Sequence, residues 1–502
     1  MGQGVFTESD FEGPESDPRL RLSDLGKLLR RTQRGIVGAA RAADRPTLAK
    51  MLAEHLGADL DRLEVIEEGW PSYDHVNVQV ALDAWLNTAG RVHRLVGMAS
   101  FRHHDFGLAD LLRRGPDGYG PVPGNVSWTN LPSGPGDQVI QAVRAGLYLV
   151  TDGETRLAML MLAADPESGE TAARLHVVAD RPGAAAEVAA TIRRLAVEHN
   201  VFRGQVVSFG QDMFGERSAV LRFHERPHVR IEDVILPEHT LHAIRRQVVG
   251  VARHREQLLA ARQHLKRGLL LYGPPGVGKT HTVRYLLGEL TGVTVVELTG
   301  DSLMMIATAC SVARTLQPAM VVVEDVDLIA EDRGMHPGRH PLLFELLNEM
   351  DGLAEDADVV FLLTTNRADV LEPALATRPG RVDQAVALGL PDADARRRLI
   401  ELYRGELILD DSRLEGELGR TDGVTASFLK ELLRRAALIA AEAGSTEDGR
   451  PLAVSADQLD AALDELLDTR NAMTRVLLGG ARAGDERPPR PPEPGLAPPD
   501  PH

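Results

Sequence analysis

The sequence has 502 residues, a hydrophobic fraction of 43% and a formal net charge of −17. These values predict a globular protein of roughly two to four domains, and the acidic balance argues against broad binding to nucleic acid or to anionic membranes. Cys310 is the only cysteine, which excludes an intrachain disulfide and is typical of the reducing cytosol. No apolar run approaches about 18 residues, and the first residues lack signal-peptide features, so we expect a cytoplasmic protein with no membrane partner.

The first 226 residues carry helix and strand signals but no chemistry that we recognise. We expect residues 1–20 to be disordered and residues 21–226 to form an α+β N-terminal domain. Helical spacing predicts two helices within residues 22–56 and one over residues 184–199. Alternation at residues 76–80 predicts a strand, and the Gly- and Pro-rich stretch 115–136 predicts a long loop. Further strands are expected at residues 146–150, 156–162, 174–179, 205–209 and 219–223.

The motif that organises the chain is Gly-Pro-Pro-Gly-Val-Gly-Lys-Thr at residues 273–280, which fits the G-x-x-x-x-G-K-T pattern of a phosphate-binding loop. An apolar run precedes it and a helical run follows, as this motif requires. Glycines let backbone N–H groups converge on phosphate oxygens, and the helix start adds its positive dipole end. Lys279 is expected to reach the β- and γ-phosphates of ATP, and Thr280 to ligate Mg²⁺. The candidate nucleotide contacts are Gly273, Pro274, Pro275, Gly276, Val277, Gly278, Lys279, Thr280 and His281.

A second apolar run, at residues 320–323, leads directly into the acidic residues Glu324, Asp325 and Asp327. ATP hydrolysis needs one carboxylate near Mg²⁺ and another to orient water. Adjacent parallel strands would bring these acids beside the phosphate-binding loop. A strand capped by solvated acids is the alternative interpretation, and the upstream loop favours the functional one.

Several further motifs follow in the order typical of one family. They are the approach to the loop at residues 266–272, Leu-Asn-Glu-Met-Asp-Gly-Leu at 347–353, a strand ending in Asn366, Leu-Glu-Pro-Ala-Leu at 371–375, Arg-Pro-Gly-Arg-Val-Asp at 378–383, and Gly-Val-Thr-Ala-Ser-Phe-Leu at 423–429. Over residues 229–467 the chain resembles an AAA+ ATPase of the AAA subgroup, which contains the protein-remodelling ATPases. The resemblance implies an α/β P-loop (Rossmann-like AAA+) domain at 227–391 and a helical lid at 392–470. We expect a Pro-rich disordered tail at 471–502.

The resemblance also implies roles for individual residues. Glu324 would lie on the Mg²⁺ side, Asp325 would activate water, and Asn366 would position that water. Arg378 and Arg381 would be arginine fingers that act on ATP held by a neighbouring subunit of a ring, usually a hexamer. Ala426 and Ser427 of the lid would lie on the adenine side, and Val234, Ile235 and Leu236 would border the base.

Two of the departures from the family pattern bear on hydrolysis and on substrate handling. The acidic pair reads Glu324-Asp325, whereas most of the family has Asp then Glu, and the shorter Asp325 is expected to slow hydrolysis. The segment expected to form the first pore loop, residues 300–306, lacks an aromatic residue and offers Met304 and Met305 instead. We identify no protease motif.

We therefore hypothesise a ring-forming ATPase that remodels a protein, with a substrate or adaptor bound through the N-terminal domain. A nucleotide-dependent scaffold or switch with little turnover is one alternative. A nucleic-acid motor is the other, and the acidic balance argues against it. The sequence does not identify the substrate.

Overall fold

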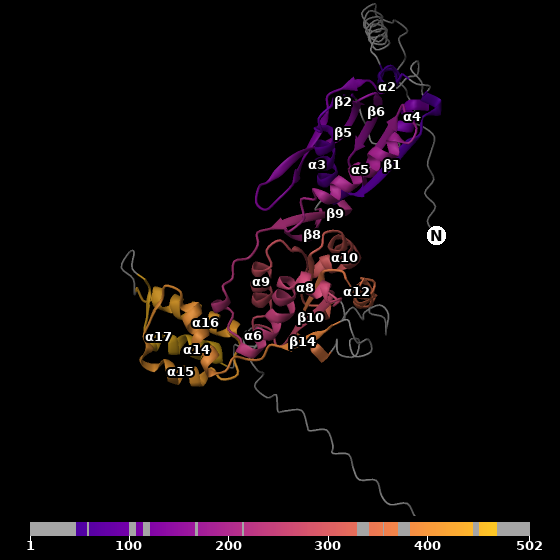
Figure 1. Cartoon of the computed structure of the whole chain (residues 1–502). Coiled ribbons are helices and arrows are strands. Elements are labelled where there is room, and N and C mark those ends of the chain that lie inside the picture. The colour runs from indigo at the N-terminus through magenta and orange to yellow at the C-terminus, as the bar shows by residue number, and fades with distance from the viewer. Residues whose placement is uncertain are drawn as a thin grey trace, which may run out of the picture.

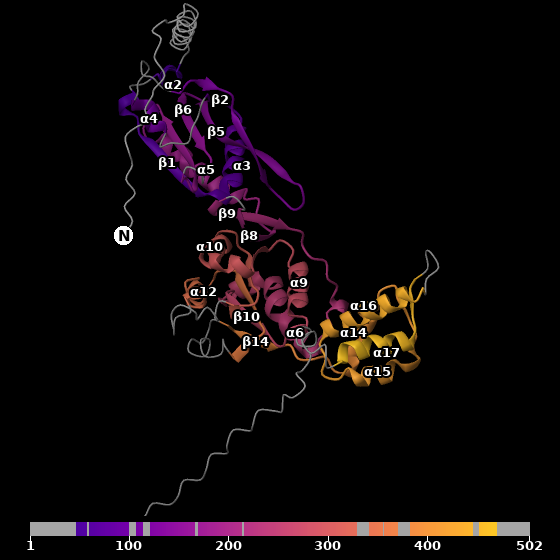
Figure 2. The same ribbon diagram turned by 180° about the vertical axis from the view of Figure 1, so that it is seen from behind.

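The structure is a computed structural model, and it describes residues 47–57, 60–99, 107–113, 121–165, 169–212, 215–328, 341–354, 356–369, 382–444 and 451–468. Three bodies follow one another along the chain (Figures 1 and 2). The N-terminal domain lies at one end, the nucleotide domain in the middle, and the helical lid beside the nucleotide domain at the other end. Among the helices of the described ranges, none is long and apolar enough to cross a membrane.

The N-terminal domain is built on an antiparallel sheet with helices on both faces. The sheet runs in the order β1-β7-β6-β5-β2-β3, and β4 pairs with β5. Its strands are β1 (Val65–Pro71), β2 (Arg91–Met98), β3 (Pro123–Gly124), β4 (Ser127–Pro132), β5 (Val139–Asp152), β6 (Thr155–Leu162) and β7 (Ala172–Ala179). Its helices are α2 (Leu48–Leu56), α3 (His75–Leu86), α4 (Leu108–Arg113) and α5 (Ala184–Glu198), and a 3₁₀ turn, η2 (Ser72–Asp74), leads into α3.

Alternate residues of the central strands pack into two separate cores. On β5, Tyr148 and Val150 pack with α3 and α5, whereas Leu147 and Leu149 pack with α2 and α4. Because both faces are covered, β5 and β6 read as continuous apolar runs instead of an alternating pattern. The strands predicted at residues 146–150, 156–162 and 174–179 and the helix at 184–199 therefore lie where expected.

Two predictions for this region are wrong. Residues 76–80 belong to α3, because their polar members are buried and hydrogen-bonded instead of facing solvent as they would on a strand. The Oε1 atom of Gln79 accepts a hydrogen bond from Val143 N at 2.9 Å, and the Oδ1 atom of Asn77 accepts one from Val201 N at 2.8 Å. The loop predicted at 115–136 contains β3 and β4. Of the two helices predicted within residues 22–56, α2 is described, and residues 1–46 lie outside the described part.

The nucleotide domain contains the second sheet, in the order β14-β10-β13-β12-β11-β8-β9. All its pairs are parallel except the β8–β9 hairpin. The strands are β8 (Val206–Asp212), β9 (Gly215–His224), β10 (Arg267–Tyr272), β11 (Thr294–Leu298), β12 (Ala319–Val323), β13 (Val359–Thr365) and β14 (Gln384–Ala387). The flanking helices are α6 (Glu238–Arg245), a π turn η5 (Arg246–Gly250), α7 (Val251–Arg253), α8 (Arg255–Ala260), α9 (Lys279–Glu289), α10 (Ile306–Thr315) and α12 (Pro341–Asp351).

The boundary predicted at residue 226 needs a correction. Both β8 and β9 are strands, as expected, but they extend the sheet of the nucleotide domain, since Val206 and Val207 of β8 pair with Val295 and Val296 of β11. An alternating pattern of apolar and polar residues predicts that a strand exists, but it does not predict which sheet the strand joins. The sequence alone therefore could not assign this hairpin to a domain.

The lid is a bundle of α14 (Ala393–Arg404), α15 (Leu414–Arg420), α16 (Ala426–Glu442) and α17 (Ala456–Leu467), with a short parallel pair, β15 (Ile408–Leu409) and β16 (Ala453–Val454). Polar side chains cap the starts of three helices, since Asp392, Thr425 and Ser455 each accept a hydrogen bond from the first turn. Leu429, Leu432, Leu433, Leu459 and Leu463 fill the core between α16 and α17.

One residue of the lid, Glu417, is a buried carboxylate with no hydrogen-bond partner among the described residues. Glu417 of α15 is buried, and neither of its carboxylate oxygens accepts a hydrogen bond within the described part of the chain. Asp460 already pairs with Arg413 at 3.3 Å and Arg420 at 2.9 Å. The pKa of Glu417 is raised to about 7, mainly by burial and also by Asp460, although Arg413 and Arg420 act to lower it.

The raised pKa predicts that the lid loses stability as pH rises. The protonated carboxyl is favoured in the folded state, whereas the unfolded residue ionises near pH 4.3, so the penalty grows between about pH 4 and 7 and stays above pH 7. Glu417→Gln is expected to slow hydrogen exchange of α15 and α17 at pH 8 by roughly tenfold, the equivalent of about one pK unit, and by less at pH 5. Glu442→Gln on the exposed end of α16 is the control. Equal exchange in Glu417→Gln and wild type at pH 8 would contradict this account.

Candidate active site

The phosphate-binding loop joins the carboxyl end of β10 to the start of α9. Gly273, Gly276 and Gly278 all have positive φ, at 152°, 79° and 101°. A Cβ on Gly273 would lie 2.1 Å from the carbonyl oxygen of Leu388, so only glycine fits there. Because α9 begins at Lys279, its first N–H groups and its dipole are directed at the loop. This backbone is suited to hold the phosphates of a nucleotide.

The Lys279 ammonium group joins the loop to the neighbouring strand. Its Nζ atom donates to Gly273 O at 2.8 Å, to Pro274 O at 2.9 Å and to Asn366 Oδ1 at 2.7 Å. The side chain is buried, and burial lowers its pKa, while Asp325 and Asp327 raise it. A buried cation at the mouth of an N–H-rich loop provides the charge that phosphate oxygens require.

Thr280 and Glu324 form the oxygen-rich side of the site. The Thr280 hydroxyl donates to the Oε2 atom of Glu324 at 3.1 Å. Burial raises the pKa of Glu324, as does Asp325, whereas the Thr280 hydrogen bond and Arg284 lower it. A hydroxyl and a carboxylate side by side are hard oxygen donors, which fit Mg²⁺ with the nucleotide phosphates completing its shell. These two residues would hold the ion.

Asp325 stands beside them in an unusual backbone conformation. Its φ is 51°, in the left-handed region that Asp and Asn tolerate better than longer side chains. Its Oδ1 atom accepts a hydrogen bond from Asn366 Nδ2 at 3.1 Å, so Lys279, Asn366 and Asp325 form one connected chain. The backbone thus gives a physical reason for aspartate at the second position of the acidic pair.

Three supporting residues received no role from sequence. The hydroxyl of Thr364 accepts a hydrogen bond from Asp325 N at 3.1 Å. The Oδ1 atom of Asp327 accepts from the Thr365 hydroxyl at 2.7 Å and from Asn366 N at 3.3 Å. A sequence feature could have indicated the two threonines, because they directly precede Asn366. They lie on β13, which pairs with the acid-bearing strand β12. Identifying them required the register of these strands.

A cavity of about 270 Å³ lies between the loop and the lid, where the base of a nucleotide is expected. Its walls include Ile235, Leu236, Val277, Leu399 and Ala426. Ser427 N donates to Gly276 O at 3.1 Å, so the lid contacts the loop directly. This apolar part of the wall suits an aromatic base. Charged residues also line the cavity, namely Glu238, Asp392, Asp394 and Arg398.

Other predicted residues lie elsewhere or outside the described ranges. Val234 is buried in the domain core and does not line the cavity. His281 is held by the segment before α6, since its Nε2 atom lies 3.1 Å from Asp233 O. Arg378 and Arg381 lie outside the described residues. Met304 is 67% exposed, whereas Met305 packs against the core.

Fold and site together define a P-loop nucleotide-binding domain with a helical lid. Residues 269–390 match the sequence model of the family described as "ATPase family associated with various cellular activities (AAA)". The chain thus carries an AAA domain, and proteins of this family use ATP with Mg²⁺.

Similar curated proteins are named ATP-dependent zinc metalloprotease FtsH. That of Mycobacterium leprae (strain TN) is 34% identical over 238 residues, which cover 44% of this chain and 29% of the relative. FtsH 4 of Sphaerobacter thermophilus is 34% identical over 301 residues, covering 56% of this chain and 43% of the relative. FtsH of Thermus thermophilus is 32% identical over 234 residues, covering 44% and 37%. The chain therefore spans less than half the length of these relatives.

The relatives are named zinc metalloproteases, and this chain contains one stretch with the residue spacing of a zinc-binding motif. His224, Glu225 and His228 have the His-Glu-x-x-His spacing of a zinc protease. That motif needs a helix to bring both histidines to one face, but here β9 ends at His224 and irregular chain follows, with Pro227 inside the motif. His224 contacts the Ser208 hydroxyl at 2.6 Å. The described residues contain no group of three His, Cys, Asp or Glu side chains that could hold a metal, so they do not fit zinc.

The contact between Thr364 and Asp325 predicts a positioning role. Thr364→Val leaves Asp325 N without its acceptor, and we expect kcat for ATP to fall by roughly tenfold, or about 1.4 kcal/mol, with KM within about twofold. Thr364→Ser should restore the rate. The control is Thr294→Val. Thr294 is also buried and accepts a backbone N–H, from Gly204 at 3.0 Å, and it donates to Leu316 O at 2.9 Å, but it lies at the start of β11, away from the acids. An equal loss of kcat in both variants would show that the effect is merely structural.

Proposed function

We propose that this chain hydrolyses ATP as part of a ring and uses the resulting movements to remodel a bound protein. The observation that supports hydrolysis best is the hydrogen-bonded chain Lys279–Asn366–Asp325 beside the Thr280–Glu324 pair. These side chains come from the loop, the acid strand and the neighbouring strand, and they converge on one point at the carboxyl edge of the sheet. A loop that only bound nucleotide would not need an aspartate whose carboxylate is held by the Asn366 amide and whose backbone N–H is held by Thr364.

The residues would divide the chemistry between them. When bound, Mg²⁺ would neutralise phosphate charge and polarise the phosphorus–oxygen bonds. Lys279 would hold the β- and γ-phosphates, and Asn366 and Asp325 would orient the attacking water, with Asp325 accepting its proton. Thr364 and Asp327 would keep these groups in place through the backbone and through Asn366.

The proposed function also includes assembly of several chains into a ring. It is supported by the AAA domain and by Arg378 and Arg381, which the family pattern assigns as fingers for the neighbouring site. A protein substrate or adaptor would bind through the N-terminal domain, and the location would be cytoplasmic. The exposed Met304 lies in the segment expected at the pore, but a methionine grips a polypeptide less firmly than an aromatic residue would.

A nucleotide-dependent scaffold is the second candidate, and the acidic pair favours it. Asp325 is one methylene shorter than the usual glutamate, and its left-handed backbone would strain a longer side chain. A scaffold would assemble and recruit partners with little turnover.

Turnover measured against protein concentration separates the two candidates. For a ring with fingers acting between subunits, kcat per chain should rise as the protein assembles, and Arg381→Ala should lower it by about 10³-fold while ATP is still bound. Lys279→Ala should abolish both binding and turnover. Arg94→Ala is a control, because this arginine is exposed on β2 of the N-terminal domain. If wild type bound ATP tightly but turned over no faster than Lys279→Ala, the scaffold would replace the motor.

A further inference from the structure

A second cavity lies at the junction of the N-terminal domain and the nucleotide domain, far from the phosphate-binding loop in the sequence. It measures about 230 Å³. The N-terminal domain contributes η2, the start of α3, β4, β5 and the chain after β6, and the nucleotide domain contributes β9. Any molecule in this cavity would touch both domains.

One side of the cavity is apolar and firmly packed. Val76 of α3, Phe202 of the turn after α5 and Leu221 of β9 are all buried, and they belong to the same hydrophobic core as the nucleotide domain. Beside them, Tyr73 of η2 stacks edge-on against Phe209 of β8, with ring centroids 5.8 Å apart and planes at 79°. This wall therefore combines residues of both domains and is preformed.

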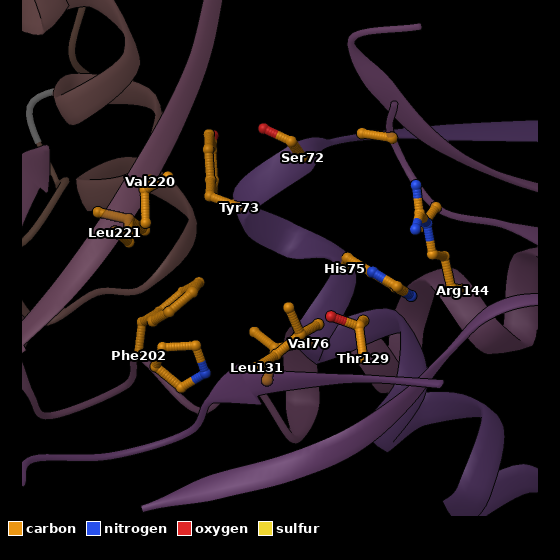
Figure 3. A pocket seen from close by; sticks show the side chains of 13 residues that line it. Ser72, Tyr73, His75, Val76, Thr129, Leu131, Arg144, Phe202, Val220 and Leu221 are labelled. Carbon is orange, nitrogen blue, oxygen red and sulfur yellow. The ribbon is translucent and has the colours of Figure 1, made fainter. Parts of the chain in front are cut away.

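The other side of the cavity is polar and carries a positive charge. Figure 3 shows Arg144 and Thr129 on the side opposite Phe202, Val220 and Leu221. The Arg144 side chain is 49% exposed, and its ion pair with Asp165 is 4.0 Å long, beyond hydrogen-bonding distance. A guanidinium has five N–H donors, so most of the Arg144 donors are not used by that pair. Arg144 is the only charged side chain among the described residues that line the cavity, apart from the titratable His75.

His75 adds no positive charge near neutral pH. Its Nε2 atom lies 3.1 Å from Val143 O, to which it donates as the neutral tautomer. Burial lowers its pKa to about 4, although the contact with Val143 raises it. The cavity thus combines one cation with hydroxyl donors and an apolar wall.

We propose that this cavity binds a small amphipathic monocarboxylate. The carboxylate would pair with the Arg144 guanidinium, whose planar fork matches its geometry, and accept a hydrogen bond from the Thr129 hydroxyl. An aromatic or branched aliphatic body would pack against Val76, Leu131 and Phe202. The volume lies below the ~300–1,000 Å³ typical of sites for drug-sized ligands, so the ligand is smaller than these. Because β9 forms part of the wall, the bound ligand would link the N-terminal domain to the ATPase sheet.

The test uses phenylacetate as the probe and the full chain without nucleotide. Binding is measured by equilibrium dialysis with labelled phenylacetate, and saturable binding with a Kd on the order of 1 mM or tighter is expected. Phenylacetamide has the same shape without the charge and should bind at least about tenfold more weakly, because a neutral amide forms weaker hydrogen bonds with a guanidinium than a carboxylate does.

Two substitutions address the two sides of the cavity separately. Arg144→Gln should weaken phenylacetate binding by about tenfold or more, and Ala164→Phe should abolish it by filling the space while leaving Arg144 in place. Arg94→Gln is the matched control, because Arg94 is exposed on β2 of the same sheet and does not line the cavity.

Three results would overturn the proposal. They are the absence of saturable binding up to 10-fold above the expected ~1 mM Kd, equal binding of phenylacetamide, and Arg144→Gln binding as tightly as Arg94→Gln. The measurement needs neither ATP nor assembly, so its outcome is independent of the proposed ATPase cycle.

Discussion

The nucleotide domain depends on one ammonium group. Lys279 joins two carbonyls of the phosphate-binding loop to Asn366 at the end of β13, so it fixes the distance between the loop and the strand beside it. The cost of burying this cation is offset by three hydrogen bonds and two nearby carboxylates. When phosphate oxygens arrive, they compete for the same donors. Nucleotide binding and the position of Asn366 are therefore linked through one side chain.

The parts of the site that lie close together in sequence were predictable, and the parts that lie far apart were not. The loop at residues 273–280, the acids at 324 and 325 and the strand ending in Asn366 each carry a local signature. The roles of Thr364 and Asp327 depend on how β12 and β13 pair, and no local pattern states that register. The left-handed conformation of Asp325 is also invisible in sequence, because aspartate occurs in many conformations.

In the fold, too, the elements with a local sequence pattern were predictable, and those that depend on distant contacts were not. Strands buried on both faces, such as β5 and β6, were found from their apolar runs, and α5 from its amphipathic spacing. Residues 76–80 misled the prediction because α3 buries polar side chains that satisfy backbone groups of β5 and of the turn after α5. A polar residue predicts a solvent-facing position only when it has no internal partner. That partner, Val143 N for Gln79, lies on another element.

The β8–β9 hairpin determines where this chain could be cut into stable fragments. A fragment cut at residue 227 would remove both strands and leave the backbone of β11 as an open sheet edge. Open edges pair with other chains, so such a fragment would be prone to aggregate. A fragment starting before β8 would keep the edge covered but would expose Phe209, which packs against Tyr73 of the N-terminal domain. The two domains are thus less separable than their order along the chain suggests, and exchanging one N-terminal domain for another would require the hairpin to move with it.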